Sequence, residues 1–163
     1  MQGEATRPTA DRVKESFFNI IAPRIVESKF TDIFSGTGSI GCEALSRGAK
    51  WVSFVDEEPK CVAIIEKNAQ RVCLKENITI YCESYKSAVK KLEKQDIIFL
   101  DPPYNKGIGV QCLDLISKYD ILESNGIAVL EHDSVEDIPE KIGNLKRFNS
   151  RKYGRAVLSF YEK

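Results

Sequence analysis

Short apolar runs alternate along the chain with longer stretches in which apolar residues recur at helical spacing. This alternation is typical of βαβ units and predicts an α/β fold, with helices on both faces of a mostly parallel sheet. The strands expected are residues 30–34, 51–56, 78–82, 96–100 and 126–131. The helices expected are residues 10–21, 39–46, 59–72, 85–92 and 108–119. Residues 146–162 are expected to form an antiparallel pair that turns at Tyr153 and Gly154.

Local signals mark the expected ends of the first three helices. Thr9 can cap the first helix with its hydroxyl, and Pro23 is expected to limit it. Gly48 closes the second helix, and Pro59 suits the first turn of the third.

The composition is that of one ordinary globular domain. With 163 residues and 42% hydrophobic content, the chain can bury a packed core. Its 24 basic and 24 acidic residues give no net charge, so a nucleic-acid surface would have to be local. Five dispersed cysteines without a CxxC pair and the lone His132 predict reduced thiols and no metal site. Without a long apolar run or a signal-peptide pattern, we expect a cytoplasmic protein with no membrane partner.

A glycine-rich loop follows the first expected strand. Glycines at positions 36, 38 and 41 allow a tight turn and the close approach of a ligand at a helix N-terminus. Such a loop alone is weak evidence, but Asp56 ends the next strand about 20 residues on, where a carboxylate can bind the hydroxyls of a ribose. A dinucleotide would fit both features. Asp32 favours S-adenosylmethionine, because a carboxylate beside the loop would repel a pyrophosphate and attract the cationic amino-acid end.

The tetrapeptide Asp101-Pro102-Pro103-Tyr104 directly follows the fourth expected strand, at the sheet edge where open α/β folds bind ligands. Its two prolines hold the turn rigid, so the Pro102 carbonyl and the Asp101 carboxylate can act as fixed acceptors. Two acceptors suit the exocyclic amine of a nucleic-acid base, and Tyr104 offers a flat face for a flipped base. In isolation such a turn could serve packing alone. Here the tetrapeptide follows the glycine-rich loop and Asp56 along the chain, and this combination favours methyl transfer to a base amine.

Further segments accompany these motifs. They are Arg7-Pro8-Thr9, residues 11–15 (DRVKE), Phe18-Asn19 and residues 43–49 (EALSRGA). With them, the chain resembles the bacterial 16S ribosomal RNA guanine-N2 methyltransferases of the RsmD type over nearly its whole length. The resemblance implies a Rossmann-like class I methyltransferase fold in a single domain of residues 1–163. It also implies a seven-stranded sheet whose last strand is antiparallel.

The resemblance implies a set of functional residues as well. The residues that would contact S-adenosylmethionine are Asp32, Phe34, Ser35, Gly36, Thr37, Gly38, Asp56, Glu57, Ser84 and Tyr85. The target guanine would lie against Asp101, Pro102, Pro103 and Tyr104. The substrate would be 16S rRNA or a small ribosomal subunit particle, and the product S-adenosylhomocysteine. We expect direct in-line transfer, with neither a metal nor a covalent enzyme intermediate.

The N-terminus departs from the family pattern. Members of the family usually carry a basic, glycine-containing strand segment before the Arg-Pro-Thr motif, whereas six residues precede Arg7 here. We expect weaker RNA affinity with cofactor binding retained. The candidate phosphate contacts are Arg7, Arg12, Lys14 and Lys106.

Three other functions remain open from the residues. The same chemistry could act on adenine N6 in DNA or RNA, because the tetrapeptide suits either amine. The glycine loop could belong to a nicotinamide-dependent oxidoreductase, although the tetrapeptide would then have no role. A non-catalytic RNA-binding module is disfavoured by the intact Asp32, Asp56 and Asp101.

Overall fold

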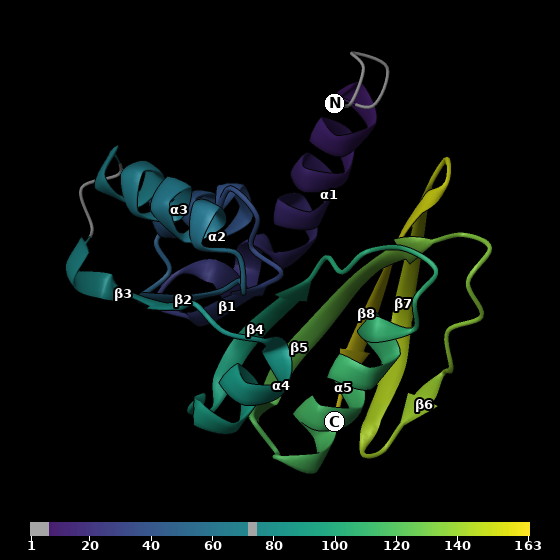
Figure 1. The fold of residues 1–163 in the computed structure, drawn as a ribbon. Coiled ribbons are helices and arrows are strands. Elements are labelled where there is room, and N and C mark those ends of the chain that lie inside the picture. The colour runs from purple at the N-terminus through teal and green to yellow at the C-terminus, as the bar shows by residue number, and fades with distance from the viewer. Residues whose placement is uncertain (1–6, 72–74) are drawn as a thin grey trace.

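A single sheet divides the helices of the protein into two layers. The computed structural model describes residues 7–71 and 75–163, and eight strands among them form one sheet in the order β3-β2-β1-β4-β5-β8-β7-β6 (Figure 1). The strands are β1 (Lys29–Ile33), β2 (Trp51–Val55), β3 (Ile78–Tyr81), β4 (Gln95–Leu100), β5 (Leu122–Asp133), β6 (Lys141–Ile142), β7 (Leu145–Tyr153) and β8 (Ala156–Glu162).

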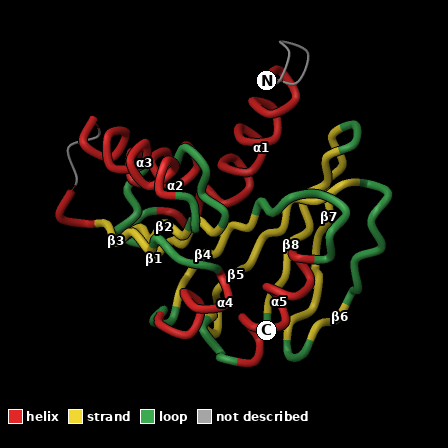
Figure 2. Tube along the Cα trace, in the orientation of Figure 1, coloured by secondary structure: helices red, strands yellow, loops and turns green. Residues whose placement is uncertain are grey.

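The helices cover both faces of this sheet (Figure 2). One face carries α1 (Arg7–Ile25), α2 (Ser39–Ser46) and α3 (Pro59–Arg71), and the other carries α4 (Tyr85–Ala88) and α5 (Ile108–Lys118). Short 3₁₀ turns span Lys75–Asn77 and Val89–Lys91. In β4, Phe99 packs in the core under α1, whereas Ile98 and Leu100 pack in the core under α4 and α5. Because both faces are covered, the strand is apolar at successive positions.

The topology gathers the loops of interest at one edge. Strands β1 to β5 pair in parallel, so their carboxyl ends meet there. Strand β8 inserts antiparallel between β5 and β7. Ala156 at the start of β8 pairs with Asp133 at the end of β5, so the turn of the β7–β8 hairpin lies at the same edge.

The expected α/β architecture is confirmed, and three details of it were wrong. The first helix begins at Arg7, so Thr9 lies inside α1 and does not cap it. Pro23 lies inside α1, which continues to Ile25. Ile25 is buried in the core, and a proline this close to the helix end removes only one hydrogen bond, so packing outweighs the loss. The sheet has eight described strands instead of seven, because β6 adds a two-residue edge that is too short to give a periodic signal.

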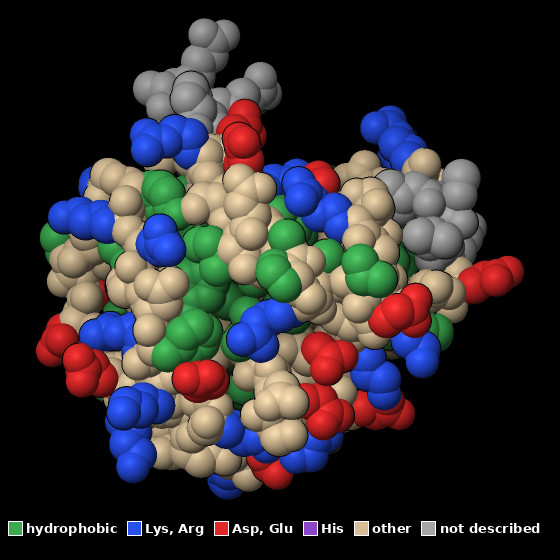
Figure 3. Space-filling model, turned by 180° about the vertical axis from the view of Figure 1, so that it is seen from behind, with side chains coloured by type: hydrophobic (Ala, Val, Ile, Leu, Met, Phe, Trp, Pro, Cys, Tyr) green, Lys and Arg blue, Asp and Glu red, His purple; other side chains and the backbone are tan. Residues whose placement is uncertain are grey.

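Other expectations concern features spread over the chain. Among the described residues, no helix combines the length and apolar character needed to cross a bilayer. Cys42, Cys61, Cys82 and Cys112 carry free thiols, and Cys73 lies outside the described residues. Figure 3 shows basic and acidic side chains interspersed around a hydrophobic area on the face seen there. A binding surface for a polyanion therefore has to be sought in local geometry.

Candidate active site

A cavity of about 790 Å³ opens at the carboxyl ends of β1, β2 and β4. Its wall includes Gly36 from the glycine-rich loop, Asp56 from the end of β2 and Asp101 from the turn after β4. Ser84 and Tyr104 line it as well. The structure thus brings the separate sequence motifs together at the sheet edge where open α/β folds bind ligands.

The loop after β1 turns through left-handed backbone conformations. Phe34, Gly36 and Gly38 have φ angles of 64°, 57° and 77°. Asp56 holds this turn in place. Its Oδ2 accepts a hydrogen bond from the Gly36 N–H at 2.8 Å, and its Oδ1 accepts one from the Glu58 N–H at 3.0 Å. The remaining lone pairs of this half-buried carboxylate can accept hydrogen bonds from ligand hydroxyls.

Two residues of the glycine loop serve the fold. The Ser35 hydroxyl donates to the Asp32 carbonyl at 2.5 Å and accepts from the Val55 N–H at 3.0 Å, which ties β1 to β2. Its hydroxyl proton is therefore used within the protein, and Ser35 also lines the cavity beside Asp32. Gly41 is required by packing, because a Cβ at this position would collide with the ring of Phe54.

Asp32 lies in an adjoining cavity of about 310 Å³ between the glycine loop and α1, and Thr37 also lines this cavity. The Asp32 side chain is 2% exposed, and its Oδ2 accepts the Gly41 N–H at 3.1 Å. Removal from water raises the pKa of Asp32 well above its usual range, and the Gly41 N–H partly opposes this shift. No cation of the described residues pairs with it, so the site suits a cationic ligand group.

Asp101 borders both cavities. Its carboxyl group is open to them, but the surrounding protein still removes much of its hydration. This desolvation, followed by the negative charge of Glu131, raises the pKa of Asp101 from 3.8 to about 7. A carboxyl group with a pKa near neutrality can exchange a proton at the pH of the cell.

Glu131 is a site residue that the motif search missed. It lines the smaller cavity, and its Oε2 accepts a hydrogen bond from the Tyr104 hydroxyl at 3.0 Å. Burial, followed by the charge of Glu131, raises the pKa of Tyr104, so the phenol stays protonated and able to donate. The signal was available, because Glu131 ends the predicted strand 126–131 just as Asp56 ends its own.

The far side of the larger cavity is partly aromatic. The rings of Phe34 and Tyr85 lie 5.3 Å apart at 52°, and the Tyr85 hydroxyl donates to Gln111 Oε1 at 2.9 Å. Ser84 and Glu57 also face this cavity, as the sequence analysis expected of ligand contacts. This wall provides stacking surface with polar groups at its margin.

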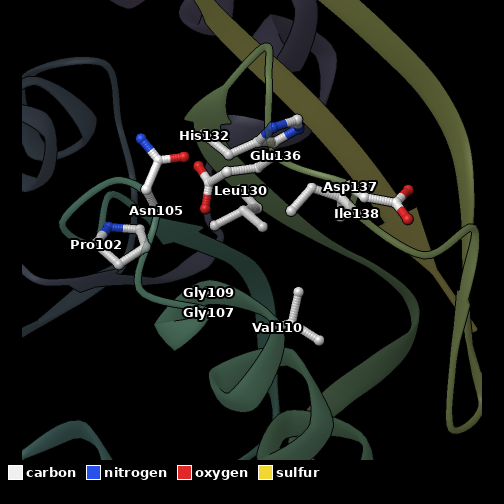
Figure 4. Close-up of a pocket in the computed structure, with 10 residues that line it drawn as sticks. All are labelled: Pro102, Asn105, Gly107, Gly109, Val110, Leu130, His132, Glu136, Asp137 and Ile138. Atoms are coloured by element: carbon white, nitrogen blue, oxygen red, sulfur yellow. The ribbon is translucent and has the colours of Figure 1, made fainter.

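Pro102 separates this site from a third cavity of about 270 Å³. Figure 4 shows that the third cavity is built from the turn after β4, from α5 and from the segment that follows β5. His132 lines it with its ring nitrogens already bonded, Nδ1 to the Asp133 carbonyl at 3.0 Å and Nε2 to Ser159 Oγ at 2.8 Å. Neither Asp32, Asp56 nor Asp101 lines this cavity, so the candidate chemistry lies on the other side of Pro102.

The four expected phosphate contacts fall in different places. The side chain of Arg7 lies outside the described residues. Lys14 is bound within the protein, where its Nζ donates to Ser39 Oγ at 2.8 Å. Arg12 and Lys106 are exposed and form no ion pair with any part of the chain that the structure describes.

Together, the strand order, the glycine loop and the acidic end of β2 define a Rossmann-like class I methyltransferase fold. The chain belongs to the family described as "Conserved hypothetical protein 95", the RsmD family, whose sequence model matches residues 1–162.

Relatives in sequence and structure agree with this assignment. The Bacillus subtilis protein YlbH is 36% identical over 99% of this chain and 90% of its own. The "Ribosomal RNA small subunit methyltransferase D" of Haemophilus influenzae is 36% identical over 80% of this chain and 70% of its own. The solved structure of a proposed methyltransferase, yhhF of Escherichia coli, has a TM-score of 0.85 at 26% identity, covering 96% of this chain and 86% of the other.

Proposed function

We propose that the protein transfers the methyl group of S-adenosylmethionine to the exocyclic N2 amine of a guanine in 16S ribosomal RNA. One observation carries the proposal: Asp101 and Pro102 line the same cavity as Asp56 and Gly36, so an amine-binding turn faces a nucleoside-binding loop. A relative that is 36% identical is named for small-subunit rRNA methylation, which supports the choice of RNA. Such a substrate places the enzyme in the cytoplasm.

The residues present fit S-adenosylmethionine. Asp32 is a buried carboxyl group without a cationic partner among the described residues, so it can pair with the ammonium group of the cofactor. Asp56 presents acceptors for two ribose hydroxyls, and the rings of Phe34 and Tyr85 offer a surface for the adenine. When bound, this cofactor supplies an electrophilic methyl group on a sulfonium.

The turn after β4 prepares the attacking amine. The Asp101 carboxylate and the Pro102 carbonyl accept the two N–H groups of the guanine amine, which withdraws its lone pair from the ring. Asp101 and Pro102 hold this nitrogen in place to receive the methyl group of S-adenosylmethionine. With its pKa raised to about 7, Asp101 then accepts the proton that the amine must lose. Tyr104, held by Glu131, orients the base by stacking.

The test is transfer of labelled methyl groups to unmodified small-subunit particles, followed by nucleoside analysis of the digested RNA. N2-methylguanosine supports the proposal. N6-methyladenosine would instead show that the protein methylates adenine. In thermal unfolding, stabilisation by NAD instead of S-adenosylhomocysteine would favour an oxidoreductase.

Two variants separate chemistry from cofactor binding. Asp101→Ala is expected to bind S-adenosylhomocysteine normally and to lose at least about 10²-fold in transfer rate, as for loss of a positioned catalytic group. Asp56→Ala is expected to weaken S-adenosylhomocysteine binding. Asp114→Ala, an exposed carboxylate on α5, is the matched control and should change neither. Normal turnover by Asp101→Ala would remove Asp101 from the site.

A further inference from the structure

A groove of about 400 Å³ runs between α1 and β7, outside the cavities described above. Its walls include Arg12 and Glu15 from α1 and Arg151 and Tyr153 from β7. The Ser16 and Tyr153 hydroxyls form a hydrogen bond that joins the two elements at its base. Figure 1 shows α1 and the tip of the β7–β8 hairpin extending toward the same end of the molecule. The groove is therefore a fixed feature between two packed elements.

The two arginines reach the groove for separate local reasons. On α1, Arg12, Glu15, Ser16 and Asn19 follow helical spacing and form a stripe that faces the groove. On β7, Arg151 pairs with Leu158, whose side chain packs in the core under α1. Directly paired residues point to the same face of a sheet, so Arg151 points toward α1 as well.

These guanidinium groups are available to a ligand. Arg12 and Arg151 are exposed, and neither side chain forms an ion pair or hydrogen bond with any residue that the structure describes. Glu15 is the acidic side chain that lines the groove, so the groove carries a net positive charge. By contrast, Arg155 in the hairpin turn is held by Asp133 at 2.6 Å. Unpaired guanidinium groups across a groove suit phosphate oxygens, which they can bind with two parallel hydrogen bonds.

Helix α1 lies between the groove and the candidate active site. Asp11 and Lys14 of α1 line the cavity that contains Asp32, whereas Arg12 lines the groove. The hairpin is anchored to the same edge, because Arg155 binds Asp133, two residues after Glu131. The groove and the cavity that contains Asp32 therefore border the same turns of α1.

We infer that the groove between α1 and β7 binds the phosphate backbone of the RNA substrate through Arg12 and Arg151, and so orients the strand for base entry. This inference rests on the proposed function and adds the β7–β8 hairpin to the substrate-binding surface. Phosphate contacts of this kind fix the position of a protein on RNA without reading its sequence.

The test compares Arg12→Gln, Arg151→Gln and the double variant for binding and methylation of the same unmodified small-subunit particles that test the proposed function. Each single change is expected to weaken RNA binding about 3- to 10-fold, as for the net loss of one solvent-exposed hydrogen bond. The slope of log K against log salt concentration should fall by about 1 for each arginine. Binding of S-adenosylhomocysteine should be retained. Glu15→Gln should tighten RNA binding, because it removes a negative charge from the groove.

Lys146→Gln is the matched control, since Lys146 is exposed on the same strand but at its opposite end. It should leave the RNA affinity and the salt slope as in the wild type. If the wild type methylates the RNA and the double variant retains its affinity and slope, the groove inference is wrong and the proposed function stands. If the wild type neither binds nor methylates the small-subunit particles, both are wrong.

Discussion

Replacing Asp101 with asparagine should make the protein less active and more stable at alkaline pH. In the native state Asp101 keeps its proton up to about pH 7, whereas a freely hydrated aspartate loses it near pH 3.8. The native state therefore binds more protons than the unfolded state between these values. Stability contributed by this group is complete below about pH 4 and is lost as the pH rises through 7. Asparagine does not ionise, so the variant escapes this loss.

The size of the effect follows from the same shift. A difference of about 3 pKa units corresponds to about 4 kcal/mol. The carboxyl group opens onto two cavities, so water screens it. We therefore expect the variant to be about 1–2 kcal/mol more stable than the wild type above pH 7 and equally stable near pH 4. Urea unfolding followed by circular dichroism at pH 4, 6 and 8 measures the difference from the wild type. Methyl transfer at pH 8 should fall by about 10²-fold.

The control is Asp114→Asn, which changes an exposed carboxylate on the adjacent helix. Its stability relative to the wild type should not depend on pH. A stability difference for Asp101→Asn that is the same at pH 4 and pH 8 would refute the raised pKa. A wild type more stable than the variant at pH 8 would show that the carboxylate is already paired and stabilising.

Three further outcomes are expected. Glu131→Gln should move the rise of methyl transfer to lower pH, because removing its negative charge lowers the pKa of Asp101; an unmoved pH profile would contradict this coupling. Affinity for S-adenosylhomocysteine should fall on acidification through the raised pKa of Asp32, and binding there should release protons, which calorimetry in buffers of different ionisation enthalpy detects. Gly41→Ala should lower the free energy of unfolding by about 1–3 kcal/mol, because the added methyl group meets the Phe54 ring; unchanged stability would mean that the ring moves freely.

Much of the fold could be predicted because the signals are local. Residues 39–46 form the expected helix, and Ile108 begins α5 as its pattern indicated. Errors occurred where tertiary packing outweighed a local preference, as at Pro23, or where an element was too short for periodicity, as in β6. The hairpin of β7 and β8 was expected, but its position next to α1 was not.

The candidate site could be located from the sequence but not completed. Gly36, Asp56 and Asp101 lie in one cavity because each follows a parallel strand, and parallel strands end at one edge. The hydroxyl of Ser35 also ties two strands together, a structural role that the motif did not reveal. A residue type within a motif does not reveal which hydrogen bonds the surrounding fold has already made.

The sequence by itself therefore determined the α/β class, the strands that carry the loops and the chemistry of the two main motifs. Periodicity, glycine and proline act over a few residues, so a linear pattern is enough to reveal them. Only the tertiary structure placed Glu131 against Tyr104 and Arg151 across a groove from Arg12. These pairs become neighbours through strand order and helix packing, and no short stretch of sequence contains both members. The raised pKa of Asp101 depends on this same assembly, because it requires the desolvation and the neighbouring charge that the folded sheet edge provides.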